Sequence, residues 1–456
     1  MTRRQSHSVW LPLLTMLTIL AMLTSCIRPV EPVVEMPLDV VTEEVTFQND
    51  EITLAGTLTL PDAVGPHPAL MLISGSGQQD RDETIPFVPG YKPFQLIAEY
   101  LTQQGIAVLR YDDRGVGGST GDPSRATTAD FAQDAEAGLT YLFSRPDINP
   151  KQIGLLGHSE GAIIAAMIAA RNPDVAFVIA MAGPAVSGYD ILIVQTERIL
   201  RTADLSEEAV TAAMAQQRQV LDLTVAEKWD ELKALLLNVG HQQIDALPAA
   251  QKEALGDVDA YLNQQIELSM RSMQGWMRYF LMYNPAEDWA QIKAPVLALF
   301  GGLDTQVDQA QNRPAFEAAL QKAGNADVTI KVFEEANHLF QQAKTGSPEE
   351  YATLPAEFVP NFLETIGVWL LARTTGQDLR SVESQSSTHD YIAVLLAPDL
   401  PDGKAVSMTA LDATKTMLKS AWLDLASLRA LYYCKRTNAF LLSCQSYEMS
   451  IVSFNF

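Results

Sequence analysis

The chain has 456 residues, enough for one large α/β domain with an insertion or for two domains. Apolar residues make up 47% of it and charged residues 19%, which is typical of a globular protein that buries a sizeable core. The formal net charge of −23 argues against nucleic acid as a partner, because phosphate binding needs clustered Lys and Arg.

The first 26 residues are predicted to be an export signal. Two arginines precede an apolar run, residues 10–22, that is too short to span a bilayer. The following Leu-Thr-Ser-Cys, ending at Cys26, resembles the bacterial lipobox, whose Cys is acylated. The alternative interpretation, an ordinary secretory signal peptide with an incidental Cys, stays open. We therefore expect an exported bacterial lipoprotein, anchored to a membrane through Cys26 at the cell surface or in the periplasm, with the Pro-rich residues 27–43 as a tether.

From residue 44 the hydrophobic pattern predicts strands and helices in alternation. Alternating apolar residues at 45–47 and 52–60 indicate an antiparallel pair with one buried face. Short continuous apolar runs then predict strands covered on both faces, with helical periodicity between them. These strands are expected at 68–74, 106–111, 153–156 and 175–181, and the helices at 94–104, 128–144 and from about 160 to 170.

The alternation stops between residues 186 and 289, where only helical periodicity is clear. It resumes with strands at 295–300 and 328–333 and helices at 310–323 and 356–371. Repeated β-α units predict a mostly parallel sheet flanked by helices. The core is thus expected in two parts, 44–185 and 290–374, with 186–289 as a helical cap insertion over the carboxyl edge of the sheet. Residues 375–456 form a tail of unknown role, in which Cys434 and Cys444 lie close enough in sequence to pair or to stay free.

Ser159 is the predicted nucleophile. It is the central residue of Gly-His-Ser-Glu-Gly, 157–161, which lies between a strand-like run and a helix-like run. This is the strand, sharp turn and helix order of the G-x-S-x-G nucleophile elbow. Side chains at Gly157 and Gly161 are expected to collide with the neighbouring strand and helix, which explains the glycines.

A serine nucleophile needs a base and an orienting acid, which in this arrangement follow it as acid and then His. Elimination leaves His338 as the base, since the other five histidines lie in the signal, before or inside the elbow, in the insertion or in the tail. Asp304 follows the preceding predicted strand and is the expected acid. Asp308 and Asp190 are weaker alternatives.

Backbone N–H groups of Glu160 and Ser76 are the expected oxyanion hole. Glu160 follows the nucleophile, and Ser76 lies in the Gly-Ser-Gly loop after the first buried strand. Nearby, Asp80, Arg81, Asp113 and Arg114 are predicted to form an ion-pair cluster that braces loops beside the site, with substrate binding as the alternative.

Together these motifs resemble the α/β-hydrolase superfamily over about residues 44–373. The resemblance includes the elbow, the Ser-Gly-Ser-Gly loop with Asp80-Arg81-Asp82, the Asp113-Arg114-Gly115 loop, Gly302-Leu303-Asp304 and Asn337-His338. It is strongest to bacterial esterases and serine-peptidase-like members on the dienelactone-hydrolase and prolyl-oligopeptidase side. The resemblance implies an α/β-hydrolase fold and a serine hydrolase; the tail has no counterpart in the family pattern.

The leading functional hypothesis is hydrolysis of a small-molecule carboxylic ester or other acyl substrate through an acyl-enzyme. A serine peptidase or thioesterase with the same three residues stays open, as does a non-catalytic binding lipoprotein. No cofactor is implied, and no His, Cys and carboxylate spacing indicates a metal site. The aromatic and Met cluster at 276–283 suggests either an acyl pocket or ordinary packing, of which packing is the more common. Substrate identity and oligomeric state are not set by the sequence.

Overall fold

The structure is a computed structural model that describes residues 40–62, 64–203 and 205–375. The predicted export signal with Cys26, most of the tether, and the tail with Cys434 and Cys444 lie outside these residues. None of the helices in the described ranges is both long enough and apolar enough to span a bilayer. The first strand begins at Val40, so the last four residues of the predicted tether belong to the sheet instead.

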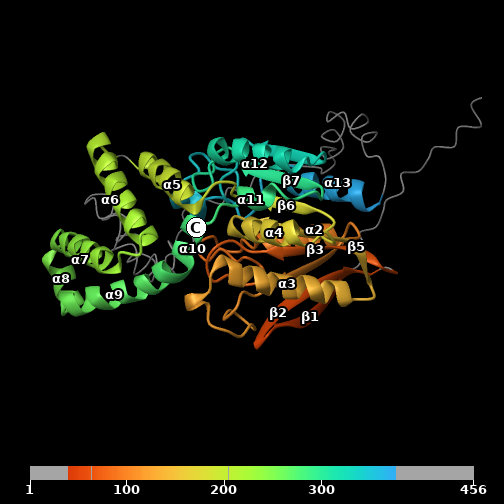
Figure 1. Cartoon of the computed structure of the whole chain (residues 1–456), viewed down its shortest axis with the longest axis horizontal. Coiled ribbons are helices and arrows are strands. Elements are labelled where there is room, and N and C mark those ends of the chain that lie inside the picture. Colours follow the sequence, from red (N-terminus) through yellow and green to blue (C-terminus); the bar gives the residue numbers. More distant parts are fainter. Residues whose placement is uncertain (1–39, 63, 204, 376–456) are drawn as a thin grey trace, which may run out of the picture. The chain divides into compact units, whose positions relative to one another are not determined.

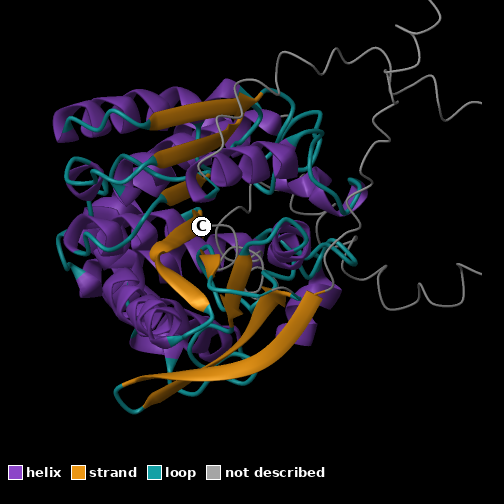
Figure 2. Cartoon of the chain, turned by 90° about the vertical axis from the view of Figure 1, so that its right-hand side faces the viewer, coloured by secondary structure: helices purple, strands orange, loops and turns teal. Residues whose placement is uncertain are grey.

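An eight-stranded sheet forms the centre of the described chain, in the order β1-β2-β4-β3-β5-β6-β7-β8 (Figures 1 and 2). The β1–β2 and β2–β4 pairs are antiparallel, and the other neighbouring pairs are parallel. This confirms the predicted mostly parallel sheet. The strands are β1 (Val40–Asn49), β2 (Ile52–Pro61), β3 (His67–Ile73), β4 (Ala107–Tyr111), β5 (Ile148–His158), β6 (Val178–Met181), β7 (Val296–Gly301) and β8 (Val328–Phe333).

Helices cover both faces of this sheet, as Figure 2 shows with helices in purple and strands in orange. Neighbouring side chains of a strand point to opposite faces, so Met71 and Leu155 enter one hydrophobic cluster while Leu70 and Leu156 enter the other. The first cluster includes α3 (Thr128–Ser144), α4 (Glu160–Arg171), α11 (Ala286–Trp289) and α12 (Gln309–Ala323), and the second includes α2 (Pro93–Thr102) and α13 (Phe362–Thr374).

The last helix, α13, begins later than predicted. Apolar periodicity placed its start near residue 356, whereas the structure begins it at Phe362. Pro360 disfavours helical backbone in the residue before it, and Asn361 adopts a left-handed φ of 65° at the N-cap. Bends and a turn occupy residues 356–361 instead, after a 3₁₀ turn that already ends at Thr353 (Pro348–Thr353).

Helices fill the stretch between β6 and β7. They are α5 (Gly188–Thr202), α6 (Glu207–Val225), α7 (Trp229–Asp245), α8 (Ala249–Leu255), α9 (Val258–Ser272), a π-helical turn (Met273–Met277), α10 (Arg278–Met282) and α11. Apart from residue 204, which is not described, no residue from 186 to 289 belongs to a strand. A small core of its own, with Val220, Leu232 and Ile266, holds α6, α7 and α9 together.

Candidate active site

Ser159 occupies the sharp turn between β5 and α4. Its φ of 52° and ψ of −118° lie outside the regions that residues with side chains usually adopt. The Ser159 N–H donates to the Met181 carbonyl oxygen at 2.8 Å, which ties the strained residue to the end of β6. Strain that neighbouring elements hold in place is a common property of functional residues.

The two glycines of the elbow are required by close backbone approaches. A Cβ on Gly157 would lie 2.0 Å from the Gly161 carbonyl oxygen, and a Cβ on Gly161 would lie 2.1 Å from the Ile73 carbonyl oxygen. Both distances are far inside van der Waals contact, and backbone atoms are the obstacle in each case. This confirms the predicted reason for glycine on either side of His158-Ser159-Glu160.

His338 and Asp304 meet at the carboxyl ends of β7 and β8. The His338 ring nitrogen Nδ1 lies 2.8 Å from Asp304 Oδ2, and both side chains are buried. Asp304 Oδ1 accepts the N–H groups of Gln306 (2.8 Å) and Val307 (2.9 Å), which fixes the carboxylate. Because this carboxylate accepts hydrogen bonds, we assign the His338 proton to Nδ1, leaving Nε2 as a proton acceptor.

Ser159 and His338 line one cavity, together with Gly75 and Ser76 of the loop after β3. The structure therefore brings the predicted nucleophile, base and oxyanion loop to one place, with Asp304 directly behind the base. The other lining residues are Gln79, Glu83, Ile85, Pro86, Phe87, His158 and Leu339.

The alternative acids lie elsewhere. Asp308 accepts the Ala310 N–H at the start of α12 and pairs with Arg198 at 2.9 Å. Asp190 is bound to Ser187 in the first turn of α5. Of the three carboxylates weighed from the sequence, Asp304 is the one that contacts His338.

Glu160 joins the elbow to three other segments through its side chain. Its carboxylate accepts hydrogen bonds from Ser76 Oγ (2.5 Å), Thr128 Oγ1 (2.6 Å) and Trp276 Nε1 (2.7 Å). Burial raises the pKa of Glu160, and these three donors oppose the rise. The hydrogen bond from Ser76 links the two residues whose backbone N–H groups are predicted to bind the oxyanion. That these N–H groups bind the oxyanion stays a prediction.

Trp276 was not predictable as a partner of the elbow, because it lies 116 residues from Glu160. Its indole donates from the π-helical turn of the inserted helices and stacks on Phe280 at 5.3 Å between ring centroids. None of the residues 276–283 lines the cavity at Ser159. Phe280 and Leu281 are buried in the main core, which agrees with packing, the alternative favoured from the sequence, for these two residues, whereas Met282 is 54% exposed.

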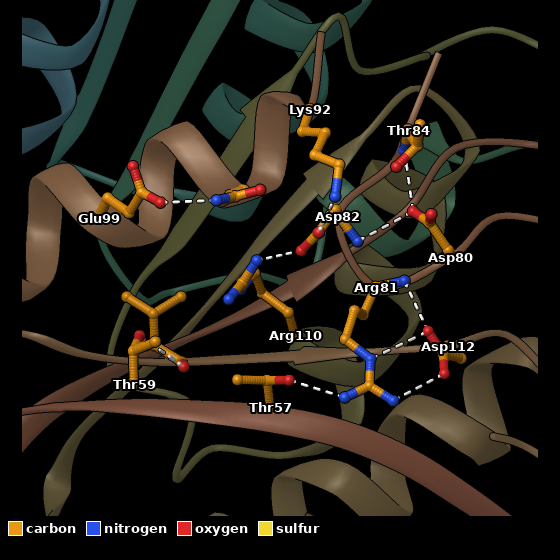
Figure 3. A network of polar contacts seen from close by, with 12 residues as sticks. Thr57, Thr59, Asp80, Arg81, Asp82, Thr84, Lys92, Glu99, Arg110 and Asp112 are labelled. Atoms are coloured by element: carbon orange, nitrogen blue, oxygen red, sulfur yellow. Dashed lines mark hydrogen bonds and ion pairs between the residues drawn. The ribbon is translucent and has the colours of Figure 1, made fainter. Parts of the chain in front are cut away.

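The loop from 80 to 84 is held by ion pairs, but not by the cluster predicted (Figure 3). Arg81 binds both carboxylate oxygens of Asp112, at 3.1 and 2.8 Å, while Asp82 pairs with Arg110 and with Lys92. Asp80 accepts the N–H of Asp82 and of Thr84 and so closes the turn. The partners of Arg81 and Asp82 lie outside residues 80–84, so these ion pairs hold the loop in place, as predicted for the charged residues of this region.

Asp113 and Arg114, also assigned to that cluster, have other partners. Asp113 accepts hydrogen bonds from Ser74 Oγ and the Gln79 N–H, both at 2.9 Å, and Arg114 pairs with Asp134 at 2.6 Å. The four-residue cluster is therefore wrong: neighbouring residues in extended chain point in opposite directions, so Asp112 faces Arg81 and Asp113 does not.

Glu83 and His158 are buried beside Ser159, and neither was predicted as a site residue from the sequence. His158 Nδ1 lies 2.8 Å from Glu83 Oε1, and its ring centroid lies 4.8 Å from that of His338. The one feature of the sequence that could have pointed to Glu83 is its position directly after the charged run Asp80-Arg81-Asp82. Among the described residues no group of three or more His, Cys, Asp or Glu side chains is placed to hold a metal ion.

Comparison with known proteins gives several relatives of this chain. Esterase EstD of Thermotoga maritima is 28% identical over 310 residues, which cover 67% of this chain and 63% of that protein. Polyketide transferase claH of Penicillium crustosum is 32% identical over 155 residues, covering 32% of this chain and 46% of the relative. The chain thus spans less than two thirds of the length of either relative.

Among solved structures, an esterase of Pyrococcus furiosus matches with 17% identity and a TM-score of 0.43, over 74% of this chain and 92% of that one. A family model described as "Serine aminopeptidase, S33" matches residues 89–342, a range that includes Ser159, Asp304 and His338. That match covers more than half of the sequence, and the elbow, sheet order and cavity agree with it: the chain belongs to the serine aminopeptidase S33 family of α/β-hydrolases.

Proposed function

We propose that this protein hydrolyses carboxylic esters through an acyl-enzyme formed on Ser159. The observation that carries the proposal is the Asp304–His338 pair, joined at 2.8 Å, at the cavity that Ser159 also lines. The relative named EstD is an esterase, which supports an ester as the substrate class.

In the first half of the reaction, Ser159 Oγ attacks the ester carbonyl carbon while His338 Nε2 takes the hydroxyl proton. Asp304 holds the Nδ1–H tautomer and stabilises the imidazolium that forms. The tetrahedral intermediate collapses when the carbon–oxygen bond to the alcohol breaks, and His338 gives the proton to the departing alkoxide.

In the second half, His338 takes a proton from water as the water oxygen attacks the acyl-enzyme. Collapse of this second intermediate releases the carboxylic acid and returns the proton to Ser159. The N–H groups of Glu160 and Ser76 are proposed to stabilise both oxyanions; such a donor typically contributes about 2.7–4 kcal/mol to the transition state.

A peptide bond is the second candidate substrate, because the matching family is described by its aminopeptidases. The chemistry of the three residues is the same, with an amine in place of the alcohol as leaving group. A thioester, with a thiol as leaving group, fits the same steps.

The test is a rate comparison with the purified full chain on p-nitrophenyl esters of graded acyl length and on aminoacyl p-nitroanilides. Ester hydrolysis that disappears in Ser159→Ala supports the proposal. Hydrolysis of anilides at a higher kcat/KM than any ester would favour the peptidase. Activity that persists in Ser159→Ala would remove Ser159 from the mechanism.

We further propose that the protein is exported and held on a membrane by acylation of Cys26. The lipobox-like Leu-Thr-Ser-Cys after an apolar run supports this. One acyl chain anchors a protein only marginally, at roughly 0.8 kcal/mol per buried CH₂, whereas several chains hold firmly. Cys26→Ala should move the protein from the membrane fraction to the soluble fraction; unchanged partitioning would contradict the anchor.

A further inference from the structure

Glu83 is a buried carboxylate in the wall of the cavity. Its side chain is 2% exposed and its backbone has a φ of 51°, a region that residues other than glycine rarely adopt. The ion-paired loop that precedes it is fixed from outside by Arg81 and Asp82 (Figure 3), and the Glu83 N–H donates to the Asp80 carbonyl at 2.9 Å. A strained residue held this firmly, with its carboxylate turned inward, needs an explanation beyond loop closure.

One oxygen of Glu83 holds two segments of the site. Glu83 Oε1 accepts the N–H of Gly75, at 2.9 Å, from the loop that is predicted to bind the oxyanion. The same oxygen accepts a hydrogen bond from His158 Nδ1 at 2.8 Å. His158 is the residue directly before Ser159, so Glu83 fixes the oxyanion loop against the elbow.

His158 extends this contact to the base. Its second ring nitrogen, Nε2, lies 3.1 Å from the backbone carbonyl oxygen of His338. A carbonyl oxygen and an ionised carboxylate both accept hydrogen bonds only, so each His158 nitrogen must carry a proton for both bonds to form. The ring is then an imidazolium whose charge is balanced by Glu83.

The electrostatics of the pocket agree with a charged ring. Burial by itself lowers the pKa of His158, but the charge and hydrogen bond of Glu83 and the His338 carbonyl together raise it above the usual value. A ring with both nitrogens engaged is not available as a general base, so the second histidine of the cavity has a different task from His338.

We propose that Glu83 and His158 are positioning residues of the hydrolase site: they fix the oxyanion loop and the backbone of His338 relative to Ser159. This rests on the proposed function of Ser159 and His338. Neither residue touches the reacting atoms in this role. They act by holding three loops in the geometry in which proton transfer and oxyanion binding occur together, and misplacement by about 1 Å can cost about 100-fold in rate.

Glu83→Gln isolates this effect. The amide oxygen can still accept from Gly75 and from His158 Nδ1–H, and the amide nitrogen takes the place of Oε2, which has no hydrogen-bond partner in the described structure. Without the negative charge His158 becomes neutral, keeps one proton and releases the His338 carbonyl. His158→Gln in the same chain replaces the ring by a neutral amide donor, so the double variant tests whether Glu83 and His158 act as one unit.

The experiment measures kcat and KM of the full chain for a p-nitrophenyl ester, with thermal unfolding to show that each variant is folded. Glu83→Gln should lower kcat about 10- to 100-fold with KM changed less than about 3-fold. The kcat of the double variant should be no lower than the kcat of the more impaired single variant. Glu99→Gln, at an exposed glutamate of α2, is the matched control and should keep wild-type kcat.

Wild-type kcat in folded Glu83→Gln, or losses that multiply in the double variant, would overturn the proposal. Failure of the proposed function looks different, because the wild-type protein would then be inactive or Ser159→Ala would be active. Should Glu83→Gln not fold, the imidazole N–H signals of wild-type protein labelled with ¹⁵N-histidine decide: two protonated nitrogens on His158 support the pair, and one contradicts it.

Discussion

Replacing Asp113 by Asn should change how the stability of this protein depends on pH. Asp113 is buried behind the oxyanion loop, and burial, helped by the nearby charges of Glu160 and Glu83, raises its pKa from 3.8 to about 8. The hydrogen bonds from the Gln79 N–H and Ser74 Oγ oppose this rise but do not cancel it. At neutral pH the folded protein therefore holds a proton on Asp113 that the unfolded chain has lost.

The sign follows from proton linkage. Between about pH 4 and pH 8 the folded state binds one more proton than the unfolded state at this residue, so the free energy of unfolding falls as pH rises. The stabilisation is fully present below the unfolded pKa and is lost as pH rises through the folded pKa. A shift from 3.8 to about 8, at about 1.4 kcal/mol per pKa unit, sets an upper value of roughly 6 kcal/mol.

Asn mimics the protonated acid. Its oxygen can accept from the Gln79 N–H, and its nitrogen can donate to Ser74 Oγ, which reverses the direction of that bond; both partners of Asp113 therefore stay hydrogen-bonded without a titratable proton. The assay is urea unfolding of both proteins between pH 4.5 and 8.5. The stability of Asp113→Asn relative to wild type should increase steadily over this range, by several kcal/mol.

Asp174→Asn, at an exposed position after α4, is the control, and its difference from wild type should stay nearly constant with pH. A constant difference for Asp113→Asn as well would show that Asp113 is ionised in the folded protein throughout the range. A difference that shrinks as pH rises would refute the reasoning outright.

Three further substitutions test other parts of the structure. Asp304→Asn should lower kcat by about 10⁴-fold because the amide favours the wrong His338 tautomer; steady-state kinetics showing a loss under 10-fold would contradict the pairing. Trp276→Phe keeps the aromatic ring but removes the indole donor to Glu160, and should cost about 1.5–3 kcal/mol in urea unfolding; an unchanged midpoint would mean that this hydrogen bond adds nothing. Gly161→Ala places a Cβ 2.1 Å from the Ile73 carbonyl oxygen and should cost about 3 kcal/mol, so a wild-type Tm would show that the elbow relaxes freely.

The sequence was most informative where local pattern and topology agree. Apolar runs identified the buried strands, and the parallel β-α order placed the residues after β5, β7 and β8 at one edge of the sheet. That is why Ser159, Asp304 and His338 were predictable although 179 residues separate the first from the last. The glycine requirement at the elbow followed from the strand, turn and helix order, although the backbone that blocks a Cβ on Gly161 belongs to the neighbouring strand β3.

Contacts between loops were not predictable in the same way. Whether Arg81 meets Asp112 or Asp113 depends on the direction in which two adjacent side chains point, and Glu83, which contacts His158, has a left-handed backbone that no residue pattern indicates. The bond from Trp276 to Glu160 depends on how the inserted helices return to the sheet. Neither hydrophobic periodicity nor a family motif carries this information.

The central claim is that Ser159 is a nucleophile activated by His338, and covalent labelling tests it most directly. The folded wild-type chain, treated with a fluorophosphonate and digested, should carry one phosphonyl adduct on the peptide that contains Ser159, and Ser159→Ala should carry none. A folded wild-type protein that stays unlabelled, or a label that persists in Ser159→Ala, would contradict the account.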